Sequence, residues 1–270
     1  MGSTDVQFSG SIPEIYGRLL VPMLFEFYAK DLARRVAAAG PRSVLETAAG
    51  TGVVTSALAV ALPAETQIIA TDLNQPMLDY AQSRLSDDRR IDWKQADALA
   101  LPFPSTSFDA VACQFGAMFF PDKAQGYKEA YRVLKLGGSF FFSVWDRIAE
   151  NEFSCVISQA VAKLFPHNPP DFFARTPHGY FQEQAIRSEL SAVGFVQIAI
   201  DVVYGVSRAS SPRDAAVAFC QGTPLRNEIQ ARDPSALQHA TDAAQRALEA
   251  RFGHGVIEGR TRTLVITARR

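Results

Sequence analysis

Hydrophobic and polar residues follow one another along residues 41–146 in a pattern that predicts alternating strands and helices. Short segments that suit strands, several of them apolar, occupy residues 43–47, 67–71, 91–95, 108–113 and 139–145. Segments with helical spacing lie between them at about 51–61, about 75–85 and 123–134, the last ended by Gly137 and Gly138. This order predicts an α/β fold with a parallel sheet wound on both faces, whose ligand binds beyond the carboxyl ends of the strands.

The regions on either side of residues 41–146 do not show this regular alternation of strands and helices. Residues 12–39 predict a helix in two pieces, because Pro13 and Pro22 suit a first turn or a break. After residue 146 we expect a helix and an aromatic loop to 181, a helix over 182–193, strands over 195–206 and 263–268, and an insertion over 207–260. In that insertion Asp233 predicts the N-cap of a helix with Pro234 at its first position.

No segment has the composition of a linker, so we expect one domain over residues 1–270. Within it we expect an N-terminal helical lid over 1–40, a cofactor-binding core over 41–146, and substrate-side insertions over 147–181 and 207–260.

Composition narrows the function. A chain of 270 residues, 47% of them hydrophobic, suffices for a large α/β domain, and its formal net charge of −1 disfavours a nucleic-acid partner. No apolar run approaches the roughly 18 residues of a membrane span, and the first ten residues lack a secretory-signal pattern. The three cysteines and four histidines are scattered. They predict no metal site and favour a cytoplasmic location.

The candidate chemistry centres on residues 44–54 (VLETAAGTGVV), which predict a strand, a turn and a helix start. The turn is nearly stripped of side chains at Ala48, Ala49, Gly50 and Gly52, so a ligand could approach the backbone N–H groups there.

Three acids support a nucleotide-like ligand, since Glu46, Asp72 and Asp97 lie in or after the first three strands. Asp72 follows Gly52 by about 20 residues, where a carboxylate can accept both hydroxyls of a ribose. The dinucleotide motif G-x-G-x-x-G would require glycine at position 55, where the chain has Thr55.

Five motifs, in order, carry a resemblance to a known family. They are VLETAAGTG (44–52), ATDLNQPML (70–78), QADALALPF (95–103), FDAV (108–111) and RVLKLGG (132–138). Together they resemble class I S-adenosylmethionine-dependent methyltransferases, most closely the small-molecule branch with quinone-biosynthesis and sterol C-methyltransferases (methyltransferase domain 11 type). The family often has Asp, Gly and Cys where this chain has Glu46, Ala48 and Ala49, and Pro in place of Leu136. The resemblance implies a doubly wound, mostly parallel seven-stranded sheet with an antiparallel last strand and helical lid insertions.

The resemblance also implies binding roles. The methionine moiety would be lined by Glu46, Ala48, Gly50, Thr51 and Gly52. The adenosine moiety would be held by Asp72 at the ribose, Leu73 and Met77 beside the adenine, Asp97 at the adenine amino group, and a backbone N–H of Ala98. Gln114 and Phe115 would face the sulfonium and the acceptor, and Tyr16 would close over the methionine end.

The expected function is transfer of a methyl group from S-adenosyl-L-methionine to an N, O or C atom of a small molecule, leaving S-adenosyl-L-homocysteine. Alignment and exclusion of water would supply most of the catalysis. Aromatic segments at 115–120 and 165–181 favour an apolar or aromatic acceptor, although core packing explains them equally well. Arg226 could grip an acceptor carboxylate.

The sequence assigns no catalytic base, because His167 and His178 suit packing or surface positions in the aromatic loop. The acceptor and the oligomeric state stay open. Two alternatives also remain: an NAD(P)-dependent oxidoreductase, disfavoured by Thr55, and a non-catalytic module that binds S-adenosylmethionine as a regulatory ligand.

Overall fold

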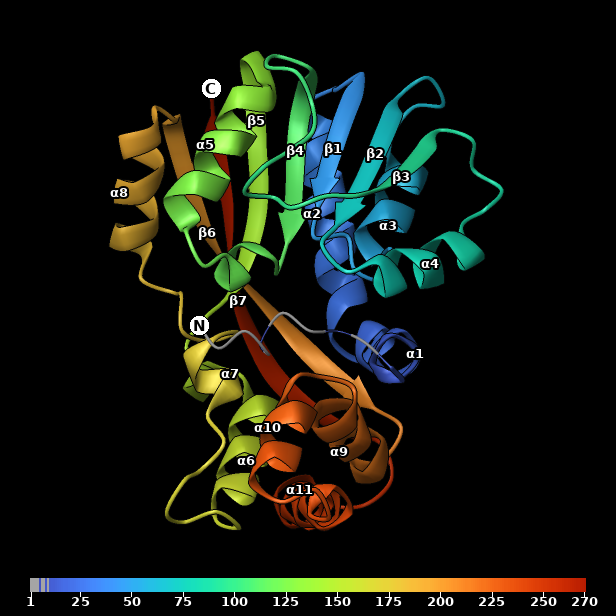
Figure 1. Ribbon diagram of the computed structural model, residues 1–270, viewed down its shortest axis with the longest axis vertical. Coiled ribbons are helices and arrows are strands. Elements are labelled where there is room, and N and C mark those ends of the chain that lie inside the picture. The colour runs from blue at the N-terminus through green and yellow to red at the C-terminus, as the bar shows by residue number, and fades with distance from the viewer. Residues whose placement is uncertain (1–4, 6–7, 9) are drawn as a thin grey trace. The chain divides into compact units, whose positions relative to one another are not determined.

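The computed structural model describes residues 5, 8 and 10–270, and Figure 1 shows the arrangement of its elements. The remaining residues of the expected lid, 1–4, 6–7 and 9, lie outside the described part. Seven strands form one sheet in the order β3-β2-β1-β4-β5-β7-β6. They are β1 (Ser43–Thr47), β2 (Gln67–Asp72), β3 (Ile91–Gln95), β4 (Phe108–Gln114), β5 (Leu134–Trp145), β6 (Val196–Ala209) and β7 (Ile257–Arg269).

The strand directions confirm the predicted sheet. The pairs β1–β2, β1–β4, β2–β3 and β4–β5 are all parallel. At one end of β5, Gly137 N donates to Arg270 O (3.0 Å), and just past its other end Asp146 N donates to Arg262 O (3.1 Å). The last strand, β7, therefore runs antiparallel to β5, as expected.

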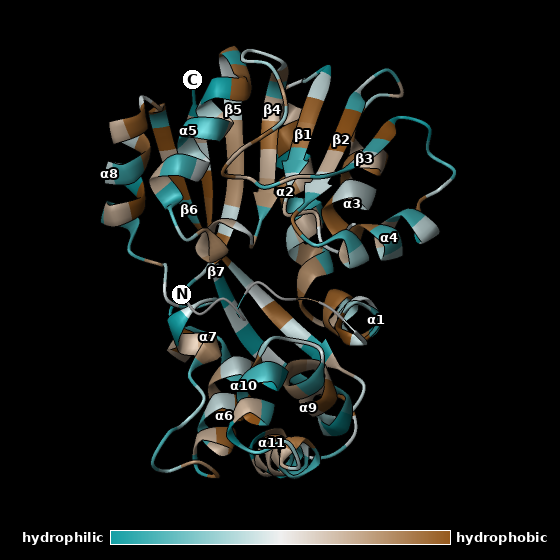
Figure 2. Cartoon of the chain, in the orientation of Figure 1, coloured by the Kyte–Doolittle hydropathy of each residue, from teal (hydrophilic) through white to brown (hydrophobic). Residues whose placement is uncertain are grey.

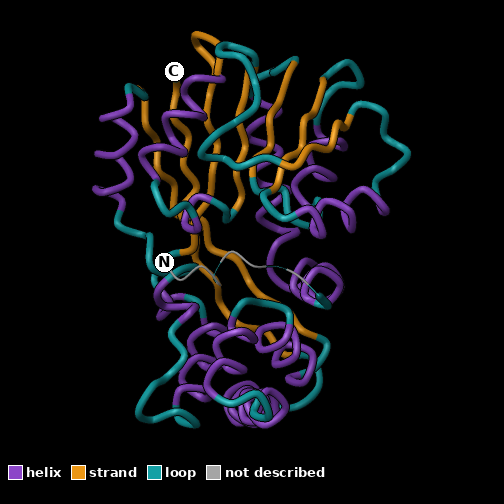
Figure 3. The backbone as a smooth tube through the Cα atoms, viewed as in Figure 1, coloured by secondary structure: helices purple, strands orange, loops and turns teal. Residues whose placement is uncertain are grey.

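The helices alternate with the strands in Figure 3. Their bounds are α1 (Ile12–Ile15), the π-helix η1 (Tyr16–Phe25), α2 (Glu26–Ala38), α3 (Val53–Ala61), α4 (Gln75–Arg84), the short 3-10 helix η2 (Ala117–Phe119), α5 (Lys123–Val133), a second 3-10 helix η3 (Ile148–Glu150), α6 (Glu152–Ala162), α7 (Phe172–Arg175), α8 (Glu183–Val193), α9 (Pro212–Gln221), α10 (Leu225–Arg232) and α11 (Leu237–Phe252). Within the described residues none of these helices has the length and apolar character needed to cross a membrane.

The chain divides into two compact units. The sheet unit comprises Glu26–Val144, Phe181–Val203 and Thr263–Arg270, and the helical unit comprises Met1–Phe25, Trp145–Tyr180 and Tyr204–Arg262. Strands β6 and β7 contribute residues to both units.

The sheet unit has a hydrophobic layer on each face of the sheet, which is why its central strands are largely apolar (Figure 2). Successive residues of β5 point to opposite faces. Phe141 joins the core under α2 and α3, with Leu32 and Leu58. Phe142 points the other way and packs against Tyr127 of α5, with ring centroids 5.5 Å apart.

Two predicted boundaries near glycine and proline are wrong. The helix over 123–134 ends at Val133, and β5 begins at Leu134, so Gly137 and Gly138 lie inside a strand. Leu134 already pairs with Phe108 across an irregular register, and this pairing extends the strand before the glycines. Pro22 lies within the continuous π-helix η1 and marks no break.

The insertion also begins and ends differently from the prediction. Helix α11 has Ala236 at its N-cap, so Asp233 and Pro234 do not open it. Asp233 instead follows α10, and its carboxylate accepts from Ser235 N at 2.8 Å. Since β6 extends to Ala209 and β7 starts at Ile257, the insertion proper contains α9, α10 and α11.

Candidate functional site

The turn between β1 and α3 is as compact as its small residues predict. Ala49 N donates to Thr71 O at 2.9 Å, and Gly52 N donates to Ala49 O at 3.0 Å. The backbone is left-handed at Ala48 (φ 55°), Gly50 (56°) and Gly52 (83°). Glycine adopts this conformation without strain, whereas Ala48 does so at a cost.

Two glycines bring other elements close to this turn. A Cβ on Gly52 would lie 3.0 Å from the Ala81 Cβ of α4 and 3.2 Å from the Trp93 ring of β3. A Cβ on Gly116, just after β4, would lie only 2.4 Å from the Ala48 Cβ. The end of β1, the segment just after β4, the second half of α4 and Trp93 of β3 therefore meet around a turn that keeps its side chains small.

Asp72, at the end of β2, ties this turn to the neighbouring strand. Its Oδ2 accepts from Gly50 N at 2.9 Å, and its Oδ1 accepts from Asn74 N at 2.8 Å. Burial raises the pKa of the carboxyl, and these donated hydrogen bonds partly offset the rise. Asn74 is the N-cap residue of α4, although its side chain makes no cap hydrogen bond.

Glu46 is a buried acid with a partner that the sequence reasoning missed. Its side chain is 1% exposed, and Oε2 accepts a 2.6 Å hydrogen bond from Thr55 Oγ1. Burial raises the pKa of Glu46 to about 8, while the Thr55 hydroxyl pulls it down. From the sequence, Thr55 was significant only as the residue in place of a third glycine. The usable signal was a hydroxyl side chain on the first turn of a largely apolar helix.

The hydroxyl of Thr51 gives the turn one unsatisfied polar atom. Its Oγ1 is buried and finds no hydrogen-bond partner among the residues that the structure describes. Buried polar groups in proteins are nearly always paired. A polar ligand lying on the turn would fit this requirement.

The expected adenine-side residues differ in exposure. Met77 is buried at 4%, Leu73 is 47% exposed, and Ala98 is half-buried. Asp97 is exposed, and its Oδ1 accepts from Leu99 N at 2.9 Å within the loop after β3. Their predicted roles toward an adenine stay predictions.

The end of β4 carries the two residues expected to face the sulfonium. Gln114 and Phe115 are both buried, and Phe115 has a left-handed backbone (φ 52°). The Phe115 ring lies edge-on to Tyr28 of α2, with centroids 5.6 Å apart. Tyr28, to which the sequence assigned no role, therefore joins the candidate site.

Tyr16 is a residue of the helical unit, whereas the other candidates lie in the sheet unit. Its ring stacks on Phe25 at a centroid distance of 5.1 Å and meets the edge of Phe8 at 5.9 Å. Closure over a methionine end thus remains a prediction. Arg226 donates to Ser11 Oγ at 2.7 Å and to Gln230 Oε1 at 3.3 Å, so its guanidinium already has partners.

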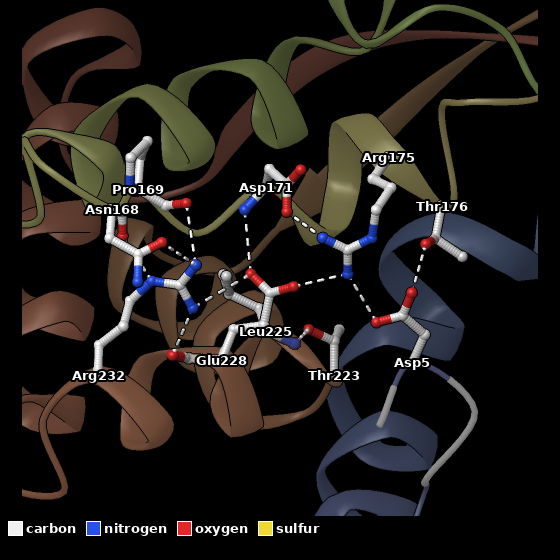
Figure 4. Close-up of polar contacts among 10 residues, drawn as sticks. All are labelled: Asp5, Asn168, Pro169, Asp171, Arg175, Thr176, Thr223, Leu225, Glu228 and Arg232. Atoms are coloured by element: carbon white, nitrogen blue, oxygen red, sulfur yellow. Dashed lines mark hydrogen bonds and ion pairs between the residues drawn. The ribbon is translucent and has the colours of Figure 1, made fainter. Parts of the chain in front are cut away.

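A network around Arg175 joins the three segments that were expected to surround a substrate (Figure 4). The guanidinium contacts the carboxylates of Asp5 and Glu228, each at 2.7 Å, and also that of Asp171. Asp5 is 1% exposed, and its second oxygen accepts from Thr176 Oγ1 at 2.8 Å. The network therefore fastens the N-terminal segment to α7 and α10 within the helical unit.

Metal-ligand geometry is not found in the described residues, where no group of three or more histidines, cysteines and acids is placed to hold an ion. Cys113 is buried, and burial raises the pKa of its thiol to about 11. A thiolate nucleophile is therefore disfavoured at this position.

Comparison with known proteins places this geometry in context. Residues 45–142 match a family model described as a methyltransferase domain. The chain is 29% identical over 174 residues to a demethylmenaquinone methyltransferase of Clavibacter sepedonicus, covering 61% of this chain and 70% of that protein. It is 41% identical over 111 residues to the enzyme of that name from Deinococcus radiodurans, covering 39% and 46%.

A solved structure extends the likeness of fold. Phosphoethanolamine N-methyltransferase 2 of Haemonchus contortus, in complex with S-adenosyl-L-methionine, aligns with a TM-score of 0.58 and 17% identity, covering 96% of this chain and 56% of that one. The chain spans about half the length of most of the curated relatives that it matches.

Proposed function

We propose that the chain is a class I S-adenosylmethionine-dependent methyltransferase and that it transfers a methyl group from S-adenosyl-L-methionine to a small-molecule acceptor. The observation that carries the proposal is the glycine turn, with the buried carboxyls of Glu46 and Asp72 beside an unpaired Thr51 hydroxyl. The five motifs of residues 44–138 surround it.

The acids suit a cationic ligand better than a dinucleotide. S-adenosylmethionine carries a sulfonium and an ammonium, and a nearby cation lowers the free energy of an ionised carboxylate. NAD(P) carries an anionic pyrophosphate instead, so it would bring no such cation to Glu46 at the turn. Thr55, at the position of the third dinucleotide glycine, argues in the same direction, since it holds Glu46 at 2.6 Å.

The proposed methyl transfer depends little on general acid or base catalysis by the protein. Bound S-adenosylmethionine supplies an electrophilic methyl group and leaves as S-adenosylhomocysteine. The residues of the turn would hold the donor, with Asp72 at the ribose and Glu46 at the methionine end. Gln114 and Phe115 would line the path of the methyl group. Alignment of donor and acceptor is worth up to roughly 7–11 kcal/mol in model reactions.

We propose an apolar or aromatic acceptor held by the insertions 147–181 and 207–260, with Tyr16 and the lid over 1–40 closing the site. The names of the Clavibacter and Deinococcus relatives, which refer to a menaquinone precursor, support an aromatic acceptor. Buried aromatic side chains of the insertion 147–181, such as Phe172 and Phe173, support the same acceptor class. A cytoplasmic location is part of the same proposal.

A thermal-shift panel with S-adenosylmethionine, S-adenosylhomocysteine, NAD and NADP tests the donor. Ligand at 100 times its dissociation constant should stabilise the protein by about 2.7 kcal/mol. A shift with NAD or NADP and none with the adenosyl ligands would refute the proposal. A screen for transfer of a labelled methyl group to phenols, amines and carboxylic acids then separates catalysis from passive binding. Adenosyl binding without transfer to any of them would favour a regulatory module.

A further inference from the structure

His178 is a buried histidine that the chemistry above does not use. It follows α7 in the helical unit, its residue is 4% exposed, and its N donates to Phe173 O at 2.8 Å. Its ring is held as well, because Nδ1 lies 2.7 Å from the backbone oxygen of Asp146. Both main chain and side chain of His178 are therefore fixed in place.

This hydrogen bond determines which ring nitrogen carries the proton. A backbone carbonyl can only accept, so Nδ1 must be the donor. In the neutral ring the lone pair is then on Nε2, which can accept a hydrogen bond. Burial lowers the pKa of His178 to about 4, so the ring is neutral at physiological pH.

The neighbouring carboxylate does not compete for the ring. Asp146 Oδ2 is paired with Arg262 Nε at 2.9 Å, and its Oδ1 accepts from Arg147 N at 2.6 Å. Asn151 reaches the Asp146 backbone oxygen at 3.3 Å and the Arg262 backbone oxygen at the same distance. The Asp146 carboxylate therefore interacts with Arg262 and with the backbone of Arg147, and only the backbone carbonyl of Asp146 contacts His178.

The surroundings of the ring are aromatic. The ring centroids of Trp145 and His178 lie 6.0 Å apart, and those of Phe25 and Trp145 also lie 6.0 Å apart. Tyr16 stacks on Phe25, which completes a row of four aromatic side chains within one unit. Trp145 and Asp146 come directly at and after the carboxyl end of β5, the kind of position where ligands of doubly wound sheets bind.

We propose that His178 determines acceptor specificity, with Nε2 accepting a hydrogen bond from a hydroxyl group on an aromatic ring that lies against Trp145. The inference rests on the proposed function and adds to it one residue and one acceptor feature. A neutral acceptor atom in apolar surroundings pairs well with a hydroxyl and is left unpaired by an analogue that lacks one. Sites of this kind discriminate strongly against such analogues.

The test compares two ligands and two variants. The ligands are 1-naphthol and 1-methoxynaphthalene, in which a methyl group replaces the hydroxyl proton. Each is titrated by calorimetry into protein saturated with S-adenosylhomocysteine. In His178→Asn the amide nitrogen can still donate to the Asp146 oxygen, while the acceptor at the Nε2 position is lost. His167→Asn is the matched control, since His167 is an exposed histidine of the preceding loop.

We expect the wild-type protein and His167→Asn to bind 1-naphthol about 10- to 100-fold more tightly than its methyl ether. In His178→Asn the ratio should fall to near one through loss of naphthol affinity alone. A wild-type protein that binds naphthol no better than the ether, or that binds neither, overturns the inference, as does a ratio that survives in His178→Asn.

A second measurement needs no variant. The 15N chemical shifts of the His178 side chain should show a protonated Nδ1 and an unprotonated Nε2, and only Nε2 should move when naphthol binds. An unmoved Nε2 resonance at saturation contradicts the inference. The adenosyl thermal shift reports separately on the donor, so failure here and failure of the proposed function can be told apart.

Discussion

The buried acid Glu46 should couple protons both to folding and to binding of the methyl donor. Its carboxyl is 1% exposed, its pKa is raised to about 8, and Thr55 is its hydrogen-bond donor. The perturbation that isolates it is Glu46→Gln, because a glutamine oxygen can still accept from Thr55 while the side chain cannot ionise. Glu65→Gln removes an exposed glutamate and is the matched control.

The sign of the effect on folding follows from the raised pKa. The favourable contribution of protonated Glu46 is fully present below the unfolded-state value of 4.5 and is lost as pH rises through about 8. Each pH unit in that window costs about 1.4 kcal/mol. Relative to Glu46→Gln, the free energy of unfolding of the wild-type protein should therefore fall by about 3 kcal/mol between pH 4.5 and pH 7.

Binding of the donor should reverse this cost, since its cationic groups favour the ionised carboxylate. The affinity of the wild-type protein for S-adenosylmethionine should rise about tenfold from pH 6 to pH 7 and level off above pH 8. Calorimetry at pH 7 in phosphate and in Tris should show release of about one proton per ligand. S-adenosylhomocysteine, which lacks the sulfonium, separates the contribution of that charge from the contribution of the ammonium.

Three results would refute this reasoning. The affinity could be flat between pH 6 and pH 8, the binding enthalpy could be the same in both buffers, or Glu46→Gln could keep the full pH dependence. Glu65→Gln should match the wild-type protein throughout. Asp72 also has a raised pKa, so whatever dependence survives in Glu46→Gln measures the share of that second acid.

Two further substitutions test the turn. Asp72→Ala should abolish the adenosyl thermal shift, and in denaturant melts it should destabilise the protein by about 1–3 kcal/mol because two backbone donors lose their acceptor. The control Asp79→Ala, at an exposed position, should stay within about 0.5 kcal/mol of the wild-type protein. An intact thermal shift in Asp72→Ala would show that this residue does not bind the ligand. Gly116→Ala should lower the free energy of unfolding by about 1–3 kcal/mol, because the new Cβ would lie 2.4 Å from the Ala48 Cβ. Adding Ala48→Gly should recover part of this loss. A double variant no more stable than Gly116→Ala would contradict the contact.

The sequence predicted the parts of the fold that depend on short-range patterns. The bounds predicted for β1 and β3 agree with the structure, because each is a short segment of strand character between turn residues. The compact turn after β1 was predictable from its alanines and glycines alone. The position of Asp72 at the end of β2 follows from the same local alternation.

The sequence could not predict pairings that depend on which face of an element a side chain occupies. Glu46 and Thr55 meet only because the turn folds α3 back against β1. Asp233 had the chemistry of an N-cap, yet its carboxylate accepts from Ser235, and α11 starts farther on. The local sequence suits Asp233 either as an N-cap or as a turn residue, and tertiary packing selected the turn.

The sequence did not predict that β7 begins at Ile257, for a related reason. Residues 257–263 alternate charged and small side chains, a pattern that suits a half-exposed strand as well as a loop. Only the apolar residues from Leu264 onward have the composition of a buried strand. The antiparallel pairing with β5 determines where β7 begins, and no local signal reports it.

The network around Arg175 bears on the order in which the chain acquires its structure. Asp5 is separated from Arg175 by 170 residues, and Glu228 comes 53 residues after Arg175. At about 5–20 residues per second, Asp5 waits roughly 10–30 s for its guanidinium partner and longer for the complete network. Asp5 therefore cannot reach its buried position in the network until long after it has itself been synthesised.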